Sequence, residues 1–164
     1  MTKGLDDMKL SFIRMDAGRR DQTFALMRAF LRHDAHYLDS SAAYGDGGDE
    51  ALHCALDLFL KMPEAGFVWL ALAGEEIVAA CVVCHAISTS RGTLVAKLDD
   101  VNVKPGLEGK GTGTAMLNAL KHELTAHGIT RIDTATHFDN PEARRFYEKL
   151  GFVTLREERL SCLL

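Results

Sequence analysis

Three glycines at alternate positions stand where an anionic ligand can meet the free amides of a helix. The segment Gly109-Lys110-Gly111-Thr112-Gly113 follows a strand-like run at 97–103 and precedes a run with helical periodicity at 114–127. The first amides of a helix have no partner within the helix and carry partial positive charge, and glycine lets a ligand approach the bare backbone. We therefore predict a phosphate cradle here.

Two familiar nucleotide-binding motifs do not fit this cradle. A P-loop counted from Gly106 reaches its second glycine at Gly111, but the next residue is Thr112 and not the required lysine. A dinucleotide fingerprint begins correctly at Gly109 and Gly111 but has Thr114 at its third glycine position. That fingerprint should also open the first strand–helix–strand unit of a fold, whereas this segment follows four predicted strands. Neither motif therefore explains the cradle.

Two adjacent carboxylates precede the cradle, and a tyrosine follows on a later helix. Asp99 and Asp100 are neighbours on the strand, so they point to opposite faces and only one can readily face a bound ligand. An apolar cleft would raise a carboxyl pKa toward a value useful for a base, whereas a solvated carboxylate or an ion pair would have no such role. We prefer Asp100, whose face Asn102 is expected to share, and keep both. Periodicity alone assigns Tyr147 to the apolar face of a later helix.

The elements that position these groups follow from hydrophobic periodicity and from turn residues. Strands are predicted at 9–15, 67–73, 77–87, 93–103, 129–136 and 152–160, and helices at 16–36, 49–63, 114–127 and 140–151. The stretch at 38–48 is rich in Ser, Ala, Gly and Asp and is predicted to be a loop. The resulting order is β-α-α-β-β-β-α-β-α-β. Early hairpins are antiparallel and the later strand–helix–strand unit is parallel, so the sheet should be mixed.

Length and charge restrict the class of partner. The chain has 164 residues, of which 47% are hydrophobic, and a formal net charge of −4, so we expect one domain over 1–164 that binds a small molecule. Without a basic field, no nucleic acid and no anionic membrane is expected as partner. No run approaches the ~20 apolar residues of a membrane helix. Residues 1–10 lack an apolar signal core, so we expect a cytoplasmic protein with a flexible N-terminus at 1–7.

The cysteines and histidines do not have the spacing of a metal site. Cys81 and Cys84 are spaced like a chelating pair, but on a strand their side chains point to opposite faces, so we predict buried small hydrophobic residues. The seven histidines lack the paired spacing of a zinc site. We therefore expect no metal.

Three segments together resemble the GCN5-related N-acetyltransferase (GNAT) family. Leu98–Pro105 and Glu108–Gly113 correspond to motif A, [QR]-x-x-G-x-[GA] after the fourth strand, and Asn140–Phe152 corresponds to motif B, with A-x-x-[FL]-Y-x-x-x-G-F-like residues. The resemblance covers nearly the whole domain. It implies an α/β (α+β-like) single-domain GNAT fold, with a mixed twisted sheet of six to seven strands flanked by about four helices.

The same resemblance implies acetyl transfer from acetyl-CoA to a primary amine of a small molecule or peptide by direct attack. It places the CoA pyrophosphate on the backbone amides of Glu108, Gly109, Lys110, Gly111, Thr112, Gly113 and Thr114. The backbone of Val101, Asn102 and Val103 would meet the pantetheine and the acetyl carbonyl, and Asn140 would contact the pantetheine arm. Arg144 or Lys149 would approach the nucleotide phosphate. Tyr147 would be the general acid toward sulfur, and Asp100 or Asp99, directly or through water, would be the base.

Two residues depart from the family pattern. Glu108 replaces the usual Gln or Arg and puts a carboxylate near the phosphates, which Lys110 and Lys104 would offset. Asn102 replaces an aromatic residue that is often found there, which alters the acceptor pocket. Neither change removes a backbone amide, so binding of the coenzyme is expected to survive.

Acceptor recognition is expected from the segments at 33–50 and 85–91, with Tyr37, Tyr44 and His85 as candidate substrate-binding residues. The acidic residues of the first segment would attract a cationic amine, or form a solvated surface. The resemblance also allows a homodimer. The alternative to an enzyme is a catalytically weak CoA-binding or sensing module.

Overall fold

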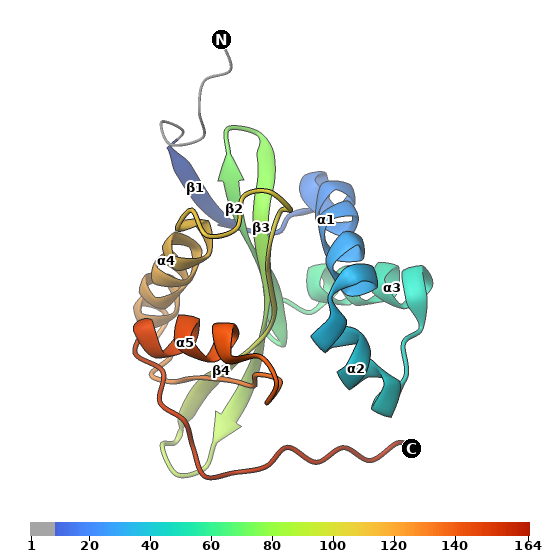
Figure 1. Ribbon diagram of the computed structural model, residues 1–164. Coiled ribbons are helices and arrows are strands. Elements are labelled where there is room, and N and C mark those ends of the chain that lie inside the picture. Colours follow the sequence, from blue (N-terminus) through green and yellow to red (C-terminus); the bar gives the residue numbers. More distant parts are fainter. Residues whose placement is uncertain (1–8) are drawn as a thin grey trace.

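Figure 1 shows the computed structural model, which describes residues 9–164, so the flexible segment expected at 1–7 lies outside the described residues. The chain begins with β1 (Leu10–Arg14), a short 3₁₀ turn (Ala17–Arg19), α1 (Arg20–His33), α2 (Ala35–Tyr44) and α3 (Gly48–Lys61). It continues with β2 (Gly66–Ala73), β3 (Glu76–Ser88), β4 (Thr93–Val103), α4 (Thr112–Ala126), β5 (Ile132–Thr134) and α5 (Pro141–Lys149).

The strands form one sheet in the order β1-β2-β3-β4-β5. Strands β1 to β4 pair antiparallel and β4 pairs parallel with β5, which confirms the predicted mixed sheet. The prediction of six to seven strands is wrong, because the described residues form five and the segment at 152–160 is not a strand. Strand β5 has only three residues, so its edge offers too few backbone groups for a further strand. The last residues instead run as an extended tail below the sheet (Figure 1).

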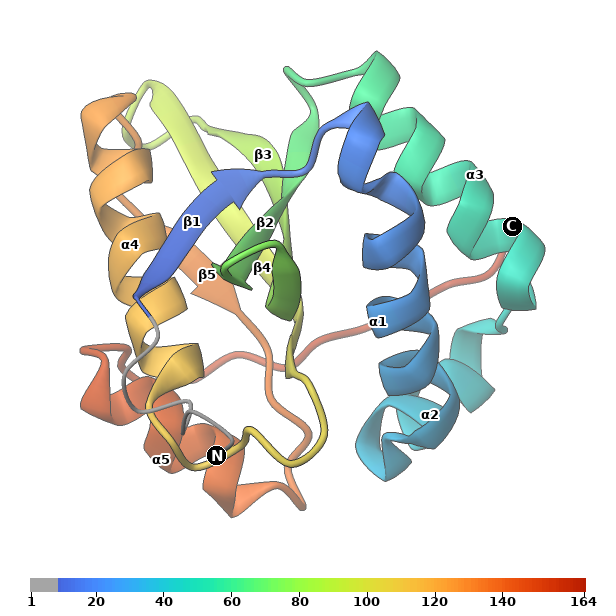
Figure 2. The same cartoon turned by 90° about the horizontal axis from the view of Figure 1, so that it is seen from above.

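Helices cover both faces of the sheet, as Figure 2 shows, with α4 on one side and α1 and α3 on the other. On the α4 side, Met116, Leu117 and Leu120 pack against buried residues of β2, β3 and β4, and the indole Nε1 of Trp69 donates to the Met116 carbonyl at 3.2 Å. On the other side, Met27 of α1 and Leu56 of α3 pack against β2 and β3. The sheet is thus buried on both faces, and the site lies where β4 leaves it.

The prediction of a loop over 38–48 is wrong for most of its length. Helix α2 begins after Asp34, whose side chain accepts a hydrogen bond from the Tyr37 amide at 2.7 Å, and it ends at Gly45 with φ of +87°. An aspartate cap and three alanines, Ala35, Ala42 and Ala43, outweigh the serines that suggested a loop. The described residues therefore form five α-helices, and not about four.

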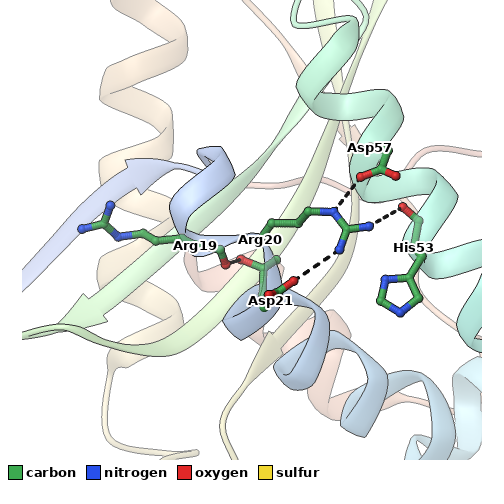
Figure 3. A network of polar contacts seen from close by, with 6 residues as sticks. Arg19, Arg20, Asp21, His53 and Asp57 are labelled. Atoms are coloured by element: carbon green, nitrogen blue, oxygen red, sulfur yellow. Dashed lines mark hydrogen bonds and ion pairs between the residues drawn. The ribbon is translucent and has the colours of Figure 1, made fainter.

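Helix α1 is tied to α3 by one arginine, as Figure 3 shows. Arg20 donates from Nε to Asp57 Oδ1 at 2.6 Å and from its terminal nitrogen to the His53 carbonyl at 3.1 Å. The hydrogen bond from Arg20 lowers the pKa of Asp57. Phe24 stacks on the His53 ring with centroids 3.8 Å apart. These contacts fix the position of α1, which forms one wall of the site.

The two central cysteines lie on opposite faces, as predicted. Cys81 is fully buried on the α4 side, whereas Cys84 packs on the side of α1 and α3, and both are free thiols. Burial raises the pKa of each thiol, so both are inert small hydrophobic groups. Within residues 9–164, no helix has the length and apolar character needed to cross a membrane.

Candidate active site

The chain between β4 and α4 presents a row of free backbone amides. Gly109 and Gly111 have φ of +72° and +84°, and Gly111 is the N-cap of α4. A Cβ added at either position would meet no atom within 4 Å, so glycine is needed here for the left-handed backbone and not for lack of space. The amides of residues 108–114 make no hydrogen bond to another residue in the part of the chain that the structure describes. The cradle can therefore bind phosphate oxygens.

The carboxylate of Glu108 turns away from this row of amides. Its Oε2 accepts a hydrogen bond from the Gly106 amide at 2.6 Å. Lys104, which we expected to offset this charge, forms an ion pair with Glu76 of β3 instead. Lys110 is exposed within the cradle and is the lysine placed to approach a bound phosphate.

A β-bulge interrupts β4 at the candidate base. Val82 pairs with Asp99 and Ala80 with Asn102, so Asp100 and Val101 both lie opposite one residue, Cys81. Asp100 has φ of +51°, and it is the single non-glycine residue with a positive φ between residues 9 and 164. The extra residue shifts the alternation, so Asn102 shares its face with Asp99. The expectation that Asp100 shares the face of Asn102 is therefore wrong.

The environment of Asp100 differs from that of Asp99. Burial and, to a smaller extent, the Asp99 charge raise the pKa of Asp100 to about 6, whereas Lys97 and Arg159 of the tail act in the opposite direction. Asp99 forms an ion pair with Lys97 at 2.7 Å. Strained backbone and a perturbed pKa are both frequent at functional sites. Asp100 is thus the better candidate for a base that exchanges a proton near neutral pH.

Tyr147 lies on α5 between two other aromatic side chains, Phe146 and Phe152, with ring centroids 5.2 Å away in each case. Burial raises the pKa of Tyr147 to about 12, the nearby Thr134 side chain acts in the opposite direction, and the charges of Asp99 and Asp100 raise it. The phenol therefore keeps its proton at neutral pH. Tyr147 packs against the core cluster that contains Cys81, the residue of β3 opposite the candidate base.

Of the three candidate acceptor residues, the structure brings two together. Tyr37 of α2 contacts Asp46 at 3.4 Å, and burial raises the pKa of Tyr37 to about 12, with smaller contributions from Asp46, Tyr44 and Asp100. Tyr37 therefore lies close to Tyr44 and close enough to the candidate base, Asp100, to feel its charge. His85 does not, because it pairs with Ala96, three positions before Asp99, and its Nδ1 donates to the Glu64 carbonyl at 2.9 Å.

The two candidate residues of motif B lie at the start of α5. Asn140 is the N-cap, and its Oδ1 accepts a hydrogen bond from the Ala143 amide at 3.1 Å. Arg144 follows on the next turn and is exposed. A capping function accounts for Asn140 in the structure, and its side-chain amide nitrogen remains free to meet a ligand.

One contact beside the site was not foreseen from the sequence. His137, in the connection from β5 to α5, accepts from the Asp139 amide at Nδ1, so its Nε2 carries the hydrogen and donates to Asp39 of α2 at 2.6 Å. His36 of α2 packs on the His137 ring at 5.1 Å. The contact joins α2 to the connection after β5. Because residues 38–48 were expected to be a loop, no sequence signal pointed to it.

The residues that the structure describes contain no group of three His, Cys, Asp or Glu side chains that could hold a metal ion. What the site brings together is an anion cradle, a half-buried carboxyl group and a half-buried phenol, all near the end of β4. Such a set can bind a phosphate-bearing ligand and move protons beside it.

The chain is similar to known acetyltransferases in sequence and in structure. The model of the acetyltransferase (GNAT) family matches residues 28–152. An uncharacterised N-acetyltransferase of Methanocaldococcus jannaschii is 28% identical over 57% of this chain and 41% of its own length. The mycothiol acetyltransferase of Streptomyces scabiei is 34% identical over 55% of this chain and 28% of its own length. The matched region therefore spans less than half the length of these curated relatives.

Solved structures agree on the fold. An aminoglycoside N-acetyltransferase determined in complex with CoA superposes with a TM-score of 0.76 at 14% identity, covering 99% of this chain and 97% of its own. At this identity the similarity shows the fold alone. With the family model matching most of the sequence, and motifs A and B at the cradle and on α5, the chain belongs to the GNAT acetyltransferase family.

Proposed function

We propose that this protein is an N-acetyltransferase that moves an acetyl group from acetyl-CoA to a primary amine of a small molecule or peptide. One observation carries the proposal. A half-buried carboxyl group with a pKa of about 6, Asp100, and a half-buried phenol, Tyr147, lie at the end of β4 that leads into the free amides of the cradle. A base, an acid and a phosphate site in this order are what acetyl transfer from a CoA thioester requires.

The residues present fit acetyl-CoA. The free amides of 108–114 would hold its pyrophosphate, with Lys110 beside them, and Arg144 would approach the nucleotide phosphate. The backbone of Val101 and Val103 would bind the pantetheine arm, with Asn140 next to it. When bound, the donor supplies an activated acetyl thioester. A backbone amide at the bulge would stabilise negative charge on the acetyl oxygen, an interaction worth about 3 kcal/mol in other enzymes.

Proton transfer is assigned to the two half-buried groups. Asp100 accepts a proton from the acceptor ammonium, directly or through a water molecule, and the freed amine forms the N–C bond as the C–S bond breaks. Tyr147 donates its proton to the sulfur, which leaves as a thiol, and the phenolate takes up the second proton that the nitrogen loses as the amide forms. Asp99 forms an ion pair with Lys97, and its negative charge helps to raise the pKa of Asp100. Asp99 is given no part in proton transfer.

The acceptor is expected to be a cation. Asp34, Asp46 and Asp100 surround the side of the site formed by α1 and α2, and Tyr37 and Tyr44 provide aromatic surface there. Three of the similar structures are named aminoglycoside acetyltransferases, and aminoglycosides are polycationic.

The experiment combines binding with turnover. Calorimetry should show binding of CoA but not of NAD or ATP, and release of free thiol from acetyl-CoA should depend on the added amine. Binding of CoA without amine-dependent thiol release would instead favour a CoA-sensing module. Binding of NAD without binding of CoA would contradict both functions.

A further inference from the structure

Helix α2 is joined to its neighbours by positions that can act as hinges. Asp34 separates it from α1 and has an extended backbone, with φ of −74° and ψ of 115°. At the other end, Gly45 and Gly48, the first residue of α3, have φ of +87° and +67°. A Cβ added at either glycine would meet no atom within 4 Å. The backbone can therefore change its angles at both ends of α2 without meeting neighbouring atoms.

Helix α2 buries little of its own surface. Ser41 is the single buried residue among its ten, and the side chains of Leu38 and Tyr44 are 44% and 37% exposed. A helix of this length is only marginally stable in water without contacts to the rest of a protein. The position of α2 therefore depends on a few specific contacts.

One hydrogen bond joins α2 to a distant segment of the chain. His137, in the connection from β5 to α5, donates from Nε2 to Asp39 Oδ2 at 2.6 Å, and the His36 ring packs on the His137 ring at 5.1 Å. His137 also holds the turn before α5, where its Nδ1 accepts from the Asp139 amide and its carbonyl from the Asn140 amide. The other side-chain hydrogen bonds of α2 within residues 9–164 stay between residues 34 and 46.

This bond connects the two sides of the candidate site. Figure 2 shows α2 on the same side of the sheet as α1 and α3, with α5 on the other side beside α4. On α2, Tyr37 is near enough to Asp100 for the charge of Asp100 to raise the pKa of Tyr37. The connection that His137 holds leads into α5, which carries Tyr147. The Asp39–His137 bond thus ties the helix beside the candidate base to the helix of the candidate acid.

We propose that α2 is a lid on the acceptor side of the site, and that the Asp39–His137 hydrogen bond is the clasp that holds the lid closed. Its role in catalysis rests on the proposed acetyl transfer. When the bond breaks, α2 moves about its two hinges and the amine gains access to Asp100. When the bond forms again, the lid limits the entry of water while the protons move. Asp39 and His137 are positioning residues and do not contact the reacting atoms.

Hydrogen exchange of the backbone amides of α2 tests the clasp without a measurement of activity. Because so short a helix is marginal on its own, the amides of residues 35–44 should exchange faster when α2 is released. Asp39→Ala and His137→Phe should each speed this exchange by about threefold, a modest factor because the Asp39 side chain is 73% exposed. His137→Phe keeps a ring that can pack on His36. The double variant should exchange no faster than the faster single variant.

Ser40→Ala is the matched control, because it changes the neighbouring residue of α2 and leaves both partners of the bond in place. Alanine favours the helix over both aspartate and serine, so a purely local effect would slow exchange in Asp39→Ala as well as in Ser40→Ala. Unchanged or slower exchange in Asp39→Ala, or effects of the two single substitutions that add in the double variant, would overturn the clasp.

Kinetics connect the clasp to the reaction. With kanamycin or an alanine-terminated peptide as the amine, Asp39→Ala should raise the KM of the amine by about threefold, because apparent affinity falls with the population of the closed lid. Asp39→Asn keeps an oxygen that can accept from His137 and should restore most of the affinity. Calorimetry should show unchanged affinity for CoA in both variants. Faster exchange with an unchanged KM would overturn the lid and leave the proposed acetyl transfer intact. Faster exchange without turnover of any amine would support the clasp and contradict the proposed function.

Discussion

Replacing Asp100 by asparagine is expected to stabilise the folded protein at alkaline pH while it removes the base. Burial raises the pKa of Asp100 from 3.8 to about 6, so the ionised carboxylate is disfavoured in the folded state. Because the folded pKa is the higher one, the folded state gains stability at low pH, in full below about pH 3.8, and loses it as the pH rises through 6. The difference of about two pKa units corresponds to about 3 kcal/mol.

Urea denaturation of Asp100→Asn at pH 4 and pH 8 measures this effect. The variant should exceed the unaltered protein by up to about 3 kcal/mol in free energy of unfolding at pH 8, and by much less at pH 4. Asparagine tolerates the left-handed backbone at this position better than most residues do. This preference contributes equally to the free energy of unfolding at both pH values, so it cancels in the comparison. Asp99→Asn is the matched control, because Asp99 forms a partly exposed ion pair with Lys97 and its loss should change stability by less than about 1 kcal/mol.

The same variant should lower kcat for acetyl transfer by about 10²-fold or more and remove the rise of the rate through pH 6, whereas Asp99→Asn should keep that rise. Equal gains at pH 4 and pH 8, or a loss of stability at pH 8, would show that the Asp100 charge carries no burial penalty. An unchanged pH–rate profile in Asp100→Asn would show that Asp100 is not the base.

Three further predictions concern the acid, the cradle and the position of α1. Tyr147→Phe should lower kcat by about 10²-fold with unchanged affinity for CoA in calorimetry, since the phenol acts only on sulfur, and full turnover would contradict this role. Gly111→Ala should cost about 1–2 kcal/mol of stability, because alanine disfavours positive φ, and should weaken CoA binding. Gly106→Ala, with φ of +86° outside the row of free amides, should cost the same stability but leave CoA binding intact; equal loss of binding in both would refute the cradle. Arg20→Gln should lower the melting temperature, because α1 loses its hydrogen bonds to Asp57 and to the His53 carbonyl, and an unchanged value would show that packing alone holds α1.

The cradle could be predicted from the sequence because its signal is local. A glycine needed for positive φ, followed by a helix with apolar periodicity, requires no knowledge of distant residues, and Gly111 is indeed the N-cap of α4. The same holds for α5, where Asn140 as cap and Pro141 as first residue mark the start. The mixed pairing of the sheet followed from connection lengths.

Features that depend on contacts between distant segments of the chain could not be predicted from the sequence. The segment at 152–160 has the alternation of a strand but finds no free edge beside the short β5. The bulge at Asp100 and Val101 depends on the register with β3, and it reverses the face that simple alternation assigns to Asn102. The position of α1 over the sheet likewise depends on a contact between distant positions, from residue 20 to residue 57.

The central claim is that the protein transfers an acetyl group from acetyl-CoA to an amine, with Asp100 and Tyr147 moving the protons. Mass spectrometry of an amine panel incubated with acetyl-CoA and the protein tests it most directly. The proposed function predicts an N-acetylated amine formed in equal amount to free CoA thiol, with loss of both products in Asp100→Asn and Tyr147→Phe. Thiol release without an acetylated amine, or equal product yields in both variants, would contradict it.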